Sequence, residues 1–260
     1  MANYISGMPL WAIVLFIASF LYSIAFIANP AKQAALNAGM SPRKSKNIQI
    51  GIFVFYILYL AYISFFSLKG EFDVNSIPPK VTIWGAVPLM IILFGFIGNT
   101  GLFKKLLRSV TLESLIFIHV FRVLGVFFII LYFYHFLPTE FAWSAGMGDI
   151  ITALLAIPVA KLVSTGSPWS RTAVVAWNIF GMLDIVTLLV IAVIDAQNPI
   201  VAAANGNLRE MTVFPFVWFP AFAPATILFL HTVIFRKLYQ LKNTQNVGGL
   251  TTQDKPRYIL

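Results

Sequence analysis

The chain has 260 residues, of which 59% are hydrophobic and only 10% are charged, and its formal net charge is +9. A soluble domain carries about 25% charged residues, so this chain lacks the polar surface that a water-soluble fold needs. The sequence contains no cysteine, which excludes disulfides and thiolate metal sites. The composition therefore predicts an all-α, polytopic membrane protein.

A membrane-spanning helix needs about 20 mainly apolar residues. Seven stretches meet this requirement, namely residues 8–28, 47–68, 81–98, 112–136, 145–163, 172–194 and 212–235. We expect a single seven-transmembrane-helix bundle over residues 1–242, followed by a flexible cytoplasmic tail over 243–260, which has few apolar residues. The lipid bilayer is the first expected partner, and the sequence leaves the oligomeric state open.

Basic residues gather on one side of the predicted spans. Fourteen Lys and Arg lie on the side of the C-terminus, whereas three lie on the side of the N-terminus. The positive-inside rule then predicts an N-terminus outside and a C-terminus in the cytoplasm, and we expect the membrane to be a bacterial cytoplasmic membrane. Because the positive charge follows the ends of the spans, it favours anionic lipid headgroups over nucleic acid as a partner.

A ten-residue pattern occurs twice, in the fifth and sixth spans. The sequence G-M-G-D-I-I-T-A-L-L starts at Gly146, and G-M-L-D-I-V-T-L-L-V starts at Gly181, with six of ten positions identical. Each copy places a carboxylate, Asp149 or Asp184, inside an apolar span. Carboxylates are costly there and are usually paired or functional. The repeat therefore indicates a buried polar centre.

Small and hydroxylated residues accompany both aspartates. Thr152 and Thr187 each follow an aspartate by three residues, so we expect each to share its helical face and to donate a hydrogen bond to it. Gly146, Gly148 and Gly181 permit close approach of neighbouring helices, as small residues do in membrane bundles. We therefore expect tight helix packing around the two carboxylates.

The fourth span carries an arginine that needs a partner. By residue count Arg122 lies near the middle of the bilayer, where an unpaired arginine costs at least about 2.5 kcal/mol. We expect Arg122 to pair with Asp184, and Asp149 to complete the network toward the outside. His119 precedes Arg122 by three residues and shares its helical face, so it joins the predicted centre.

Residues 146–149 match the G-x-G-D motif of intramembrane aspartyl proteases. Such enzymes need two carboxylates close enough to share a proton. Counted from the expected span ends, Asp149 lies about three residues and Asp184 about eleven residues below the outer surface, a depth difference of roughly 12 Å. That separation and the weakness of a four-residue motif disfavour the protease, which we keep only as a minor alternative.

Histidines offer a second alternative. His119 and His231 are both expected in the inner half of the bundle, and two imidazoles can hold a b-type haem between helices. A haem-binding or metal-binding redox protein that uses His119 and His231 as ligands therefore stays open.

The seventh span contains three prolines around Trp218. Each of Pro215, Pro220 and Pro224 removes a backbone hydrogen bond, so we expect the outer half of this span to be kinked or partly unwound. Carbonyl groups freed at that depth are tolerated where they line a cavity. Trp218 is therefore a candidate ligand-binding residue.

Taken together, these patterns favour an integral membrane protein whose polar centre binds or translocates a small molecule or ion, either as a transporter or as a ligand-binding sensor. The residues predicted to bind the ligand are His119, Arg122, Asp149, Thr152, Asp184, Thr187 and Trp218. The sequence leaves open whether the protein is an enzyme and which residues would then be catalytic.

Overall fold

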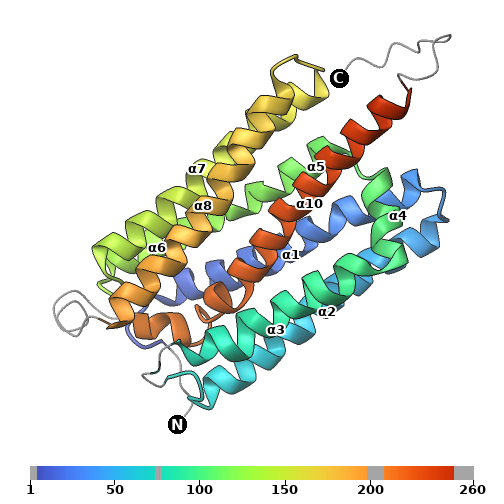
Figure 1. Cartoon of the computed structure of the whole chain (residues 1–260). Helices are drawn as coiled ribbons and strands as arrows, with labels where there is room; N and C mark the ends of the chain where they lie inside the picture. Colours follow the sequence, from blue (N-terminus) through green and yellow to red (C-terminus); the bar gives the residue numbers. More distant parts are fainter. Residues whose placement is uncertain (1–4, 74–75, 77, 198–207, 249–260) are drawn as a thin grey trace.

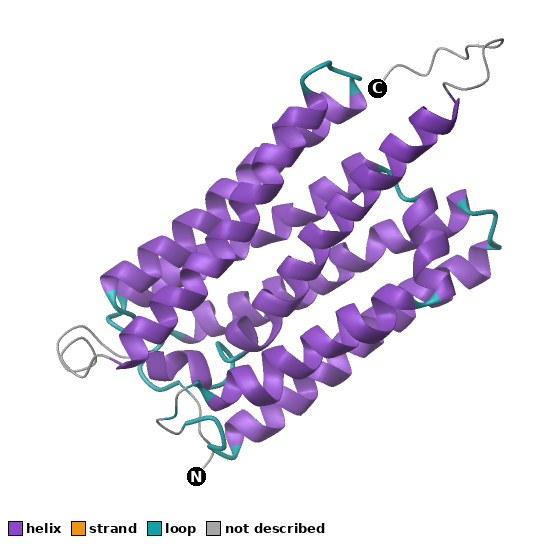
Figure 2. Cartoon of the chain, viewed as in Figure 1, coloured by secondary structure: helices purple, strands orange, loops and turns teal. Residues whose placement is uncertain are grey.

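The computed structural model describes residues 5–73, 76, 78–197 and 208–248, and helices make up most of them. The elements are α1 (Leu10–Asn37), α2 (Pro42–Leu68), η1 (Thr82–Ala86), α3 (Val87–Met90), η2 (Ile91–Phe96), η3 (Ile97–Asn99), α4 (Gly101–Ser109), α5 (Leu112–Phe117), η4 (Ile118–Gly125), α6 (Val126–Phe133), α7 (Thr139–Ser164), α8 (Ser170–Gln197), η5 (Leu208–Thr212) and α10 (Trp218–Gly248). Figure 2 shows helices joined by short loops, and the described part of the chain contains no strand.

In the described part of the chain, seven helical segments are long and apolar enough to cross a membrane. They are Leu10–Asn37, Pro42–Leu68, Thr82–Asn99, Leu112–Phe133, Thr139–Ser164, Ser170–Ile194 and Trp218–Asn243. Each corresponds to one predicted span. The expectation of an all-α, seven-helix membrane protein is thus confirmed, and the protein is an integral membrane protein.

The fourth and seventh spans form the interior of the bundle. In the most apolar 18-residue stretch of each of these two spans, 61% and 72% of the residues are buried. In the other five spans, the corresponding share is 22–39%. Figure 1 shows α10 running through the bundle, with α7 and α8 side by side on one flank and α1 and α2 on the other. Side chains on the fourth and seventh spans are therefore the ones farthest from lipid.

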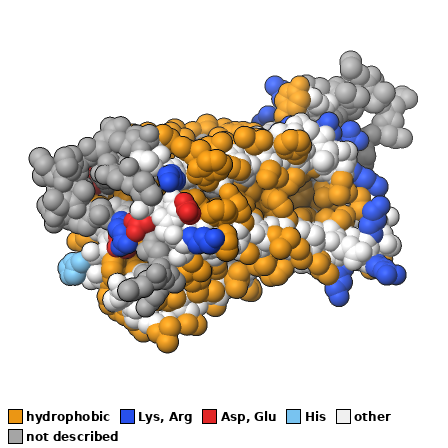
Figure 3. All heavy atoms as spheres, turned by 90° about the horizontal axis from the view of Figure 1, so that it is seen from below, with side chains coloured by type: hydrophobic (Ala, Val, Ile, Leu, Met, Phe, Trp, Pro, Cys, Tyr) orange, Lys and Arg blue, Asp and Glu red, His pale blue; other side chains and the backbone are white. Residues whose placement is uncertain are grey.

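The outer surface is apolar along its length and basic at one end. Figure 3 shows hydrophobic side chains over the middle of the molecule and Lys and Arg gathered at one end. The exposed basic residues at the α1–α2 connection and on α4 belong to this end: Arg43, Lys44, Lys46, Lys104, Lys105 and Arg108. This segregation is what lipid in the middle and headgroups at the ends require, and the orientation across the membrane stays a prediction.

The fourth span changes its helical type at mid-length. Between α5 and α6 the chain forms the 3-10 helix η4. A 3-10 helix has three residues per turn, so side chains three apart lie directly above one another. His119, Arg122 and Gly125 therefore form a single line along this helix, and all three are buried.

The seventh span is partly unwound at its start, as expected from its prolines. Residues 213–217, which include Pro215, lie outside any helix, and α10 begins only at Trp218. α2 holds this entry point, because the Trp218 indole Nε1 donates to Ser64 Oγ at 2.9 Å and Tyr59 Oη donates to the Ala221 carbonyl oxygen at 2.8 Å. The first turn of α10 is thus tied to a neighbouring span.

The C-terminal end of α10 overlaps the start of the predicted tail over residues 243–260. The helix continues through Gly248, so the first residues of the segment expected to be a tail are helical. Residues 249–260, which make up the rest of it, lie outside the described part of the chain.

Candidate functional site

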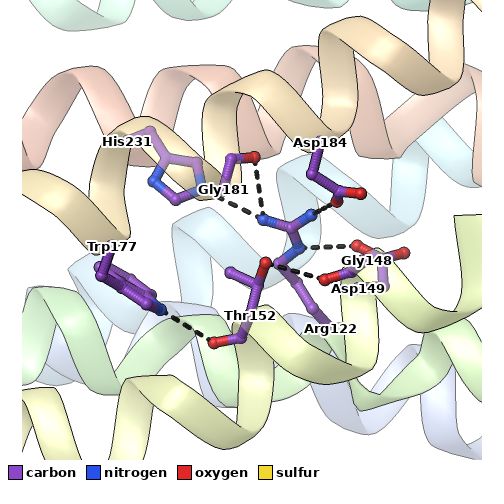
Figure 4. Close-up of polar contacts among 8 residues, drawn as sticks. All are labelled: Arg122, Gly148, Asp149, Thr152, Trp177, Gly181, Asp184 and His231. Carbon is purple, nitrogen blue, oxygen red and sulfur yellow. Dashed lines mark hydrogen bonds and ion pairs between the residues drawn. The ribbon is translucent and has the colours of Figure 1, made fainter. Parts of the chain in front are cut away.

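The guanidinium of Arg122 is the hub of a buried polar centre. Its Nε donates to Asp149 Oδ1 at 2.6 Å, and its Nη2 pairs with Asp184 Oδ2. Its Nη1 donates to the Gly181 carbonyl oxygen at 3.2 Å and lies 3.2 Å from His231 Nε2. Figure 4 shows these four groups surrounding the guanidinium, from α7, α8 and α10. The predicted pairing of Arg122 with Asp184 is therefore confirmed by the geometry, and Asp149 contacts the same guanidinium directly.

The imidazole of His231 has a defined role in this network. Asn178 donates through Nδ2 to the His231 carbonyl oxygen at 3.1 Å, which places its Oδ1 2.8 Å from His231 Nδ1. An amide oxygen only accepts hydrogen bonds, so the network assigns the proton to Nδ1. The lone pair on Nε2 then accepts from Arg122. Both ring nitrogens of a neutral His231 are thus in use.

Two glycines provide the space that the carboxylates occupy. A Cβ placed on Gly125 would lie 2.5 Å from the Cβ of Asp149. A Cβ placed on Gly148 would overlap the carboxylate of Asp184. Contacts this short do not occur between real side chains, so only glycine at these positions lets α7 and α8 bring their carboxylates to Arg122.

Gly181 and Gly146 also permit close packing, because a side chain at either position would collide with a neighbour. A Cβ on Gly181 would lie 2.5 Å from Cε1 of His231, so the imidazole occupies the space over this residue. A Cβ on Gly146 would lie 2.6 Å from Cγ1 of Ile129, where α7 crosses the fourth span. The expectation that Gly146, Gly148 and Gly181 allow close helix approach is therefore confirmed.

The centre has more negative than positive formal charge. Two carboxylates face one guanidinium, and the guanidinium has five N–H donors, four of which are used by its partners. Among the described residues, Oδ2 of Asp149 and Oδ1 of Asp184 accept no hydrogen bond. Two carboxylate oxygens and one N–H of Arg122 are thus left over, so acceptors predominate, which suits a cation or a hydrogen-bond donor better than an anion.

His119 is buried beside this centre without a polar partner. Its side chain has no solvent exposure, and within the described chain neither Nδ1 nor Nε2 has a hydrogen-bond partner. Its ring centroid lies 4.1 Å from that of His231 and 5.2 Å from that of Trp177, which meets it edge-on. The Trp177 indole donates to the Thr152 carbonyl oxygen at 3.0 Å instead. Buried polar atoms are nearly always hydrogen-bonded, so His119 marks a position for a polar ligand or water.

The geometry does not fit a haem between the two histidines. With ring centroids 4.1 Å apart, His119 and His231 leave no room for a macrocycle between them. In addition, the ring nitrogens of His231 already contact Asn178 and Arg122. The described residues contain no group of three or more His, Cys, Asp and Glu that could hold a metal ion. The geometry therefore does not support His119 and His231 as a pair of haem ligands, and their role as metal ligands stays a prediction.

The predicted difference in depth between the two aspartates is also wrong, because both contact one guanidinium. The error came from the boundary of the fifth span, expected at residue 145. α7 begins at Thr139, so Asp149 lies ten residues into it, and Asp184 lies thirteen residues before the end of α8 at Gln197. The protease alternative is still disfavoured, because Arg122 occupies the position between the carboxylates where a protease holds a shared proton and water.

Three other predicted site residues lie outside the centre. Thr152 is buried, but its Oγ1 donates to the Gly148 carbonyl oxygen at 2.8 Å and not to Asp149. Thr187 is exposed on the outer face of α8. Trp218 packs among aromatic rings of α1, with its centroid 5.3 Å from that of Phe20.

Sequence reasoning missed three residues of the centre: Gly125, Trp177 and Asn178. A signal existed for two of them. Asn178 is a lone amide inside an apolar span, where polar side chains usually bond a neighbouring helix. Gly125 follows Arg122 by three residues, the spacing of the 3-10 helix. Trp177 carried no such signal, because an aromatic residue is ordinary in an apolar span.

Comparison with known proteins gives one match. A family model described as a domain of unknown function, DUF8737, matches residues 78–239. No curated protein and no solved structure matches the chain. The matched region covers the third to the sixth span and most of the seventh, and it contains every residue of the Arg122 centre. Because the match covers more than half of the chain, this protein belongs to the DUF8737 family.

Proposed function

We propose that this protein binds a small cation at the Arg122 centre and moves it across the bilayer. The observation that carries the proposal is the charge balance: Asp149, which is buried, and Asp184, which is partly buried, share a single guanidinium. The formal charge of −1 lies in the middle of a membrane-spanning bundle. Holding an isolated charge there costs about 2.5–3.5 kcal/mol, and a bound cation offsets that cost.

An anionic ligand is a poorer fit. The positive group of the centre, Arg122, already donates to or contacts four acceptors. An anion would have to displace a carboxylate that is held by complementary charge and by glycine-sized gaps in the packing. A cation needs only the acceptor oxygens that Asp149 and Asp184 leave unbonded.

Movement, as opposed to static binding, is supported by irregular helices in the bundle. Arg122 lies on the 3-10 segment η4, and the third span, which packs against α10, contains two π-helical segments, η1 and η2. Such interruptions inside long helices are often functional hinges, and transporters place their binding sites at discontinuous helices. The side chains of Asp149 and Asp184 are only 7% and 10% exposed, so a cation reaches them when neighbouring helices move.

The test is a comparison of cation flux in proteoliposomes that contain the purified full chain. The panel comprises protons, Na⁺, K⁺ and a small organic ammonium ion, each driven by an imposed gradient. We expect one of these to cross with the wild-type protein, and we expect Asp184→Asn to reduce that flux at least tenfold. Glu113→Gln is the matched control, because Glu113 is exposed at the start of α5, away from Arg122.

Three outcomes are decisive. Selective flux that is lost in Asp184→Asn but kept in Glu113→Gln supports the proposal. Equal flux in both variants, with both folded, contradicts it and leaves the charges a packing role. Stabilisation of the wild-type protein by one cation without any flux contradicts translocation and makes the same site that of a ligand sensor.

A further inference from the structure

We infer that the cation is a proton, and that it is exchanged between the carboxylate pair on one side of Arg122 and the imidazole of His119 on the other. The inference rests on the proposed function and names the substrate of the same site. It also gives a role to His119, which the Arg122 network itself does not use.

The small number of available oxygen ligands favours a proton over a metal cation. Metal ions that bind oxygen typically take six or more ligands. Among the described residues, the unbonded side-chain oxygens are Oδ2 of Asp149 and Oδ1 of Asp184, and the carbonyl group of Gly181 on α8 is used by Arg122. A proton needs a single lone pair, which either carboxylate provides.

The charges that face the centre balance with one added proton. The titratable groups that the surrounding elements contribute are His119 and Arg122 from η4, Asp149 from α7, Asp184 from α8 and His231 from α10. Arg122 neutralises one carboxylate, and one proton on the other neutralises the second. The carboxylate pair therefore holds one proton in the occupied state and none in the empty state.

A group other than Arg122 must pass the proton onward. Arginine does not lose its proton in proteins, so the guanidinium blocks a direct route along the centre. His231 cannot replace it, because its Nδ1–H is held by Asn178 and its Nε2 accepts from Arg122. A second proton on His231 would remove that acceptor and place a cation against the guanidinium.

His119 has the properties that a relay needs. Neither of its ring nitrogens has a partner among the described residues, and the ring is fully buried. It contacts His231, which in turn contacts Arg122, so it lies on the Nη1 side of the guanidinium while the carboxylates lie on the Nε and Nη2 side. An imidazole can accept a proton on one ring nitrogen while it releases a proton from the other, which suits transfer through a bound water.

The experiment measures proton flux and carboxyl protonation in the same variants. Flux is followed with a pH-sensitive dye trapped in proteoliposomes under a valinomycin-imposed K⁺ potential, and protonated carboxyl groups are detected by infrared difference spectroscopy. We expect His119→Gln to reduce proton flux about 100-fold, the lower range for loss of a proton-transferring side chain, while the carboxylic acid band persists. His135→Gln is the control, because His135 is exposed in the α6–α7 connection.

A second measurement needs no variant of the centre. The chain has three histidines, so the imidazole ¹⁵N signals of the labelled wild-type protein are few. His135→Gln identifies the signal of His135, and the hydrogen bond of His231 Nδ1 to Asn178 distinguishes His231 from His119. We expect His231 to stay in its Nδ1–H form at every pH at which protons cross. We expect the signal of His119 to show exchange between neutral and protonated forms. Failure of His119→Gln to fold therefore leaves the inference testable.

The results separate the inference from the proposed function. Wild-type flux of Na⁺, K⁺ or ammonium without proton flux keeps the proposed function and overturns the proton. Proton flux that is unchanged in a folded His119→Gln, or a His119 signal that stays neutral throughout, overturns the relay alone. Loss of all selective flux in the wild-type protein overturns both.

Discussion

Arg122 is the residue through which four spans are held together. Its contacts reach α7, α8 and α10 from the 3-10 segment of the fourth span. Removal of one partner from a buried ion pair leaves an uncompensated charge, which is far more costly than loss of an exposed pair. The guanidinium is therefore structural as well as electrostatic, and the two roles need separate measurements.

Substitution of Arg122 by alanine tests the structural role. We expect Arg122→Ala to lower the free energy of unfolding by about 3–5 kcal/mol, because Asp149 and Asp184 would then face each other without a counter-charge. Reversible unfolding in detergent, followed by circular dichroism, measures the change. A loss of less than about 1 kcal/mol, the range of exposed ion pairs, would show that the carboxylates do not depend on Arg122.

The close packing at the glycines predicts that a larger side chain there lowers the free energy of unfolding. Gly148→Ala introduces a Cβ that overlaps the Asp184 carboxylate, and overpacking of this kind costs about 1–3 kcal/mol. Gly51→Ala is the matched control, because a Cβ at Gly51 meets no atom within 4 Å and alanine is the better helix former in α2. Equal unfolding free energies for the two variants would contradict the close approach of α7 and α8.

At the scale of elements, the end of α10 fixes the short amphipathic helix α4. Lys237 Nζ donates to the carbonyl oxygens of Leu107 at 3.1 Å and Arg108 at 2.9 Å, in the last turn of α4. These carbonyl groups have no partner within their own helix, and a cation at a helix C-terminus also interacts favourably with the helix dipole. The basic end of the seventh span therefore holds α4 in place.

Loss of this cap has a local consequence. We expect Lys237→Met to speed hydrogen exchange of the α4 amides about fivefold, which corresponds to about 1 kcal/mol of local stability. Lys242→Met on the same helix is the control, because Lys242 is exposed. Hydrogen exchange followed by mass spectrometry resolves α4 from the spans. Unchanged exchange in Lys237→Met would mean that lipid or other contacts hold α4.

At the scale of the whole molecule, the basic end should face the cytoplasm. The chain has no cysteine, so single cysteines can be introduced as reporters without removing native ones. We expect a membrane-impermeant maleimide to label Glu71→Cys in intact cells, and to label Lys105→Cys only after the membrane is opened. Both positions are exposed in the fold. The reverse labelling pattern would invert the predicted topology.

The sequence was sufficient to predict the seven spans and the ion pair, because both follow from the requirements of a bilayer. Apolar length reports a span directly, and a buried Arg122 requires a carboxylate within reach. The depth of Asp149 was not predictable, because Glu140 and Ser144 made the first turns of α7 look like a loop. The rotation of each helix about its own axis was not predictable from the sequence either. This rotation turns Thr187 outward and brings Asn178 to His231.

The central claim is that the charges of the Arg122 centre serve cation movement, and that the fold can form without them. The most direct measurement is the cation flux of a triple variant, Arg122→Met with Asp149→Leu and Asp184→Leu. Apolar replacement of a complete buried ion network often preserves stability, in contrast to removal of one member. We expect this variant to unfold at a temperature close to that of the wild-type protein and to transport no cation. Wild-type flux in the folded triple variant would contradict the claim.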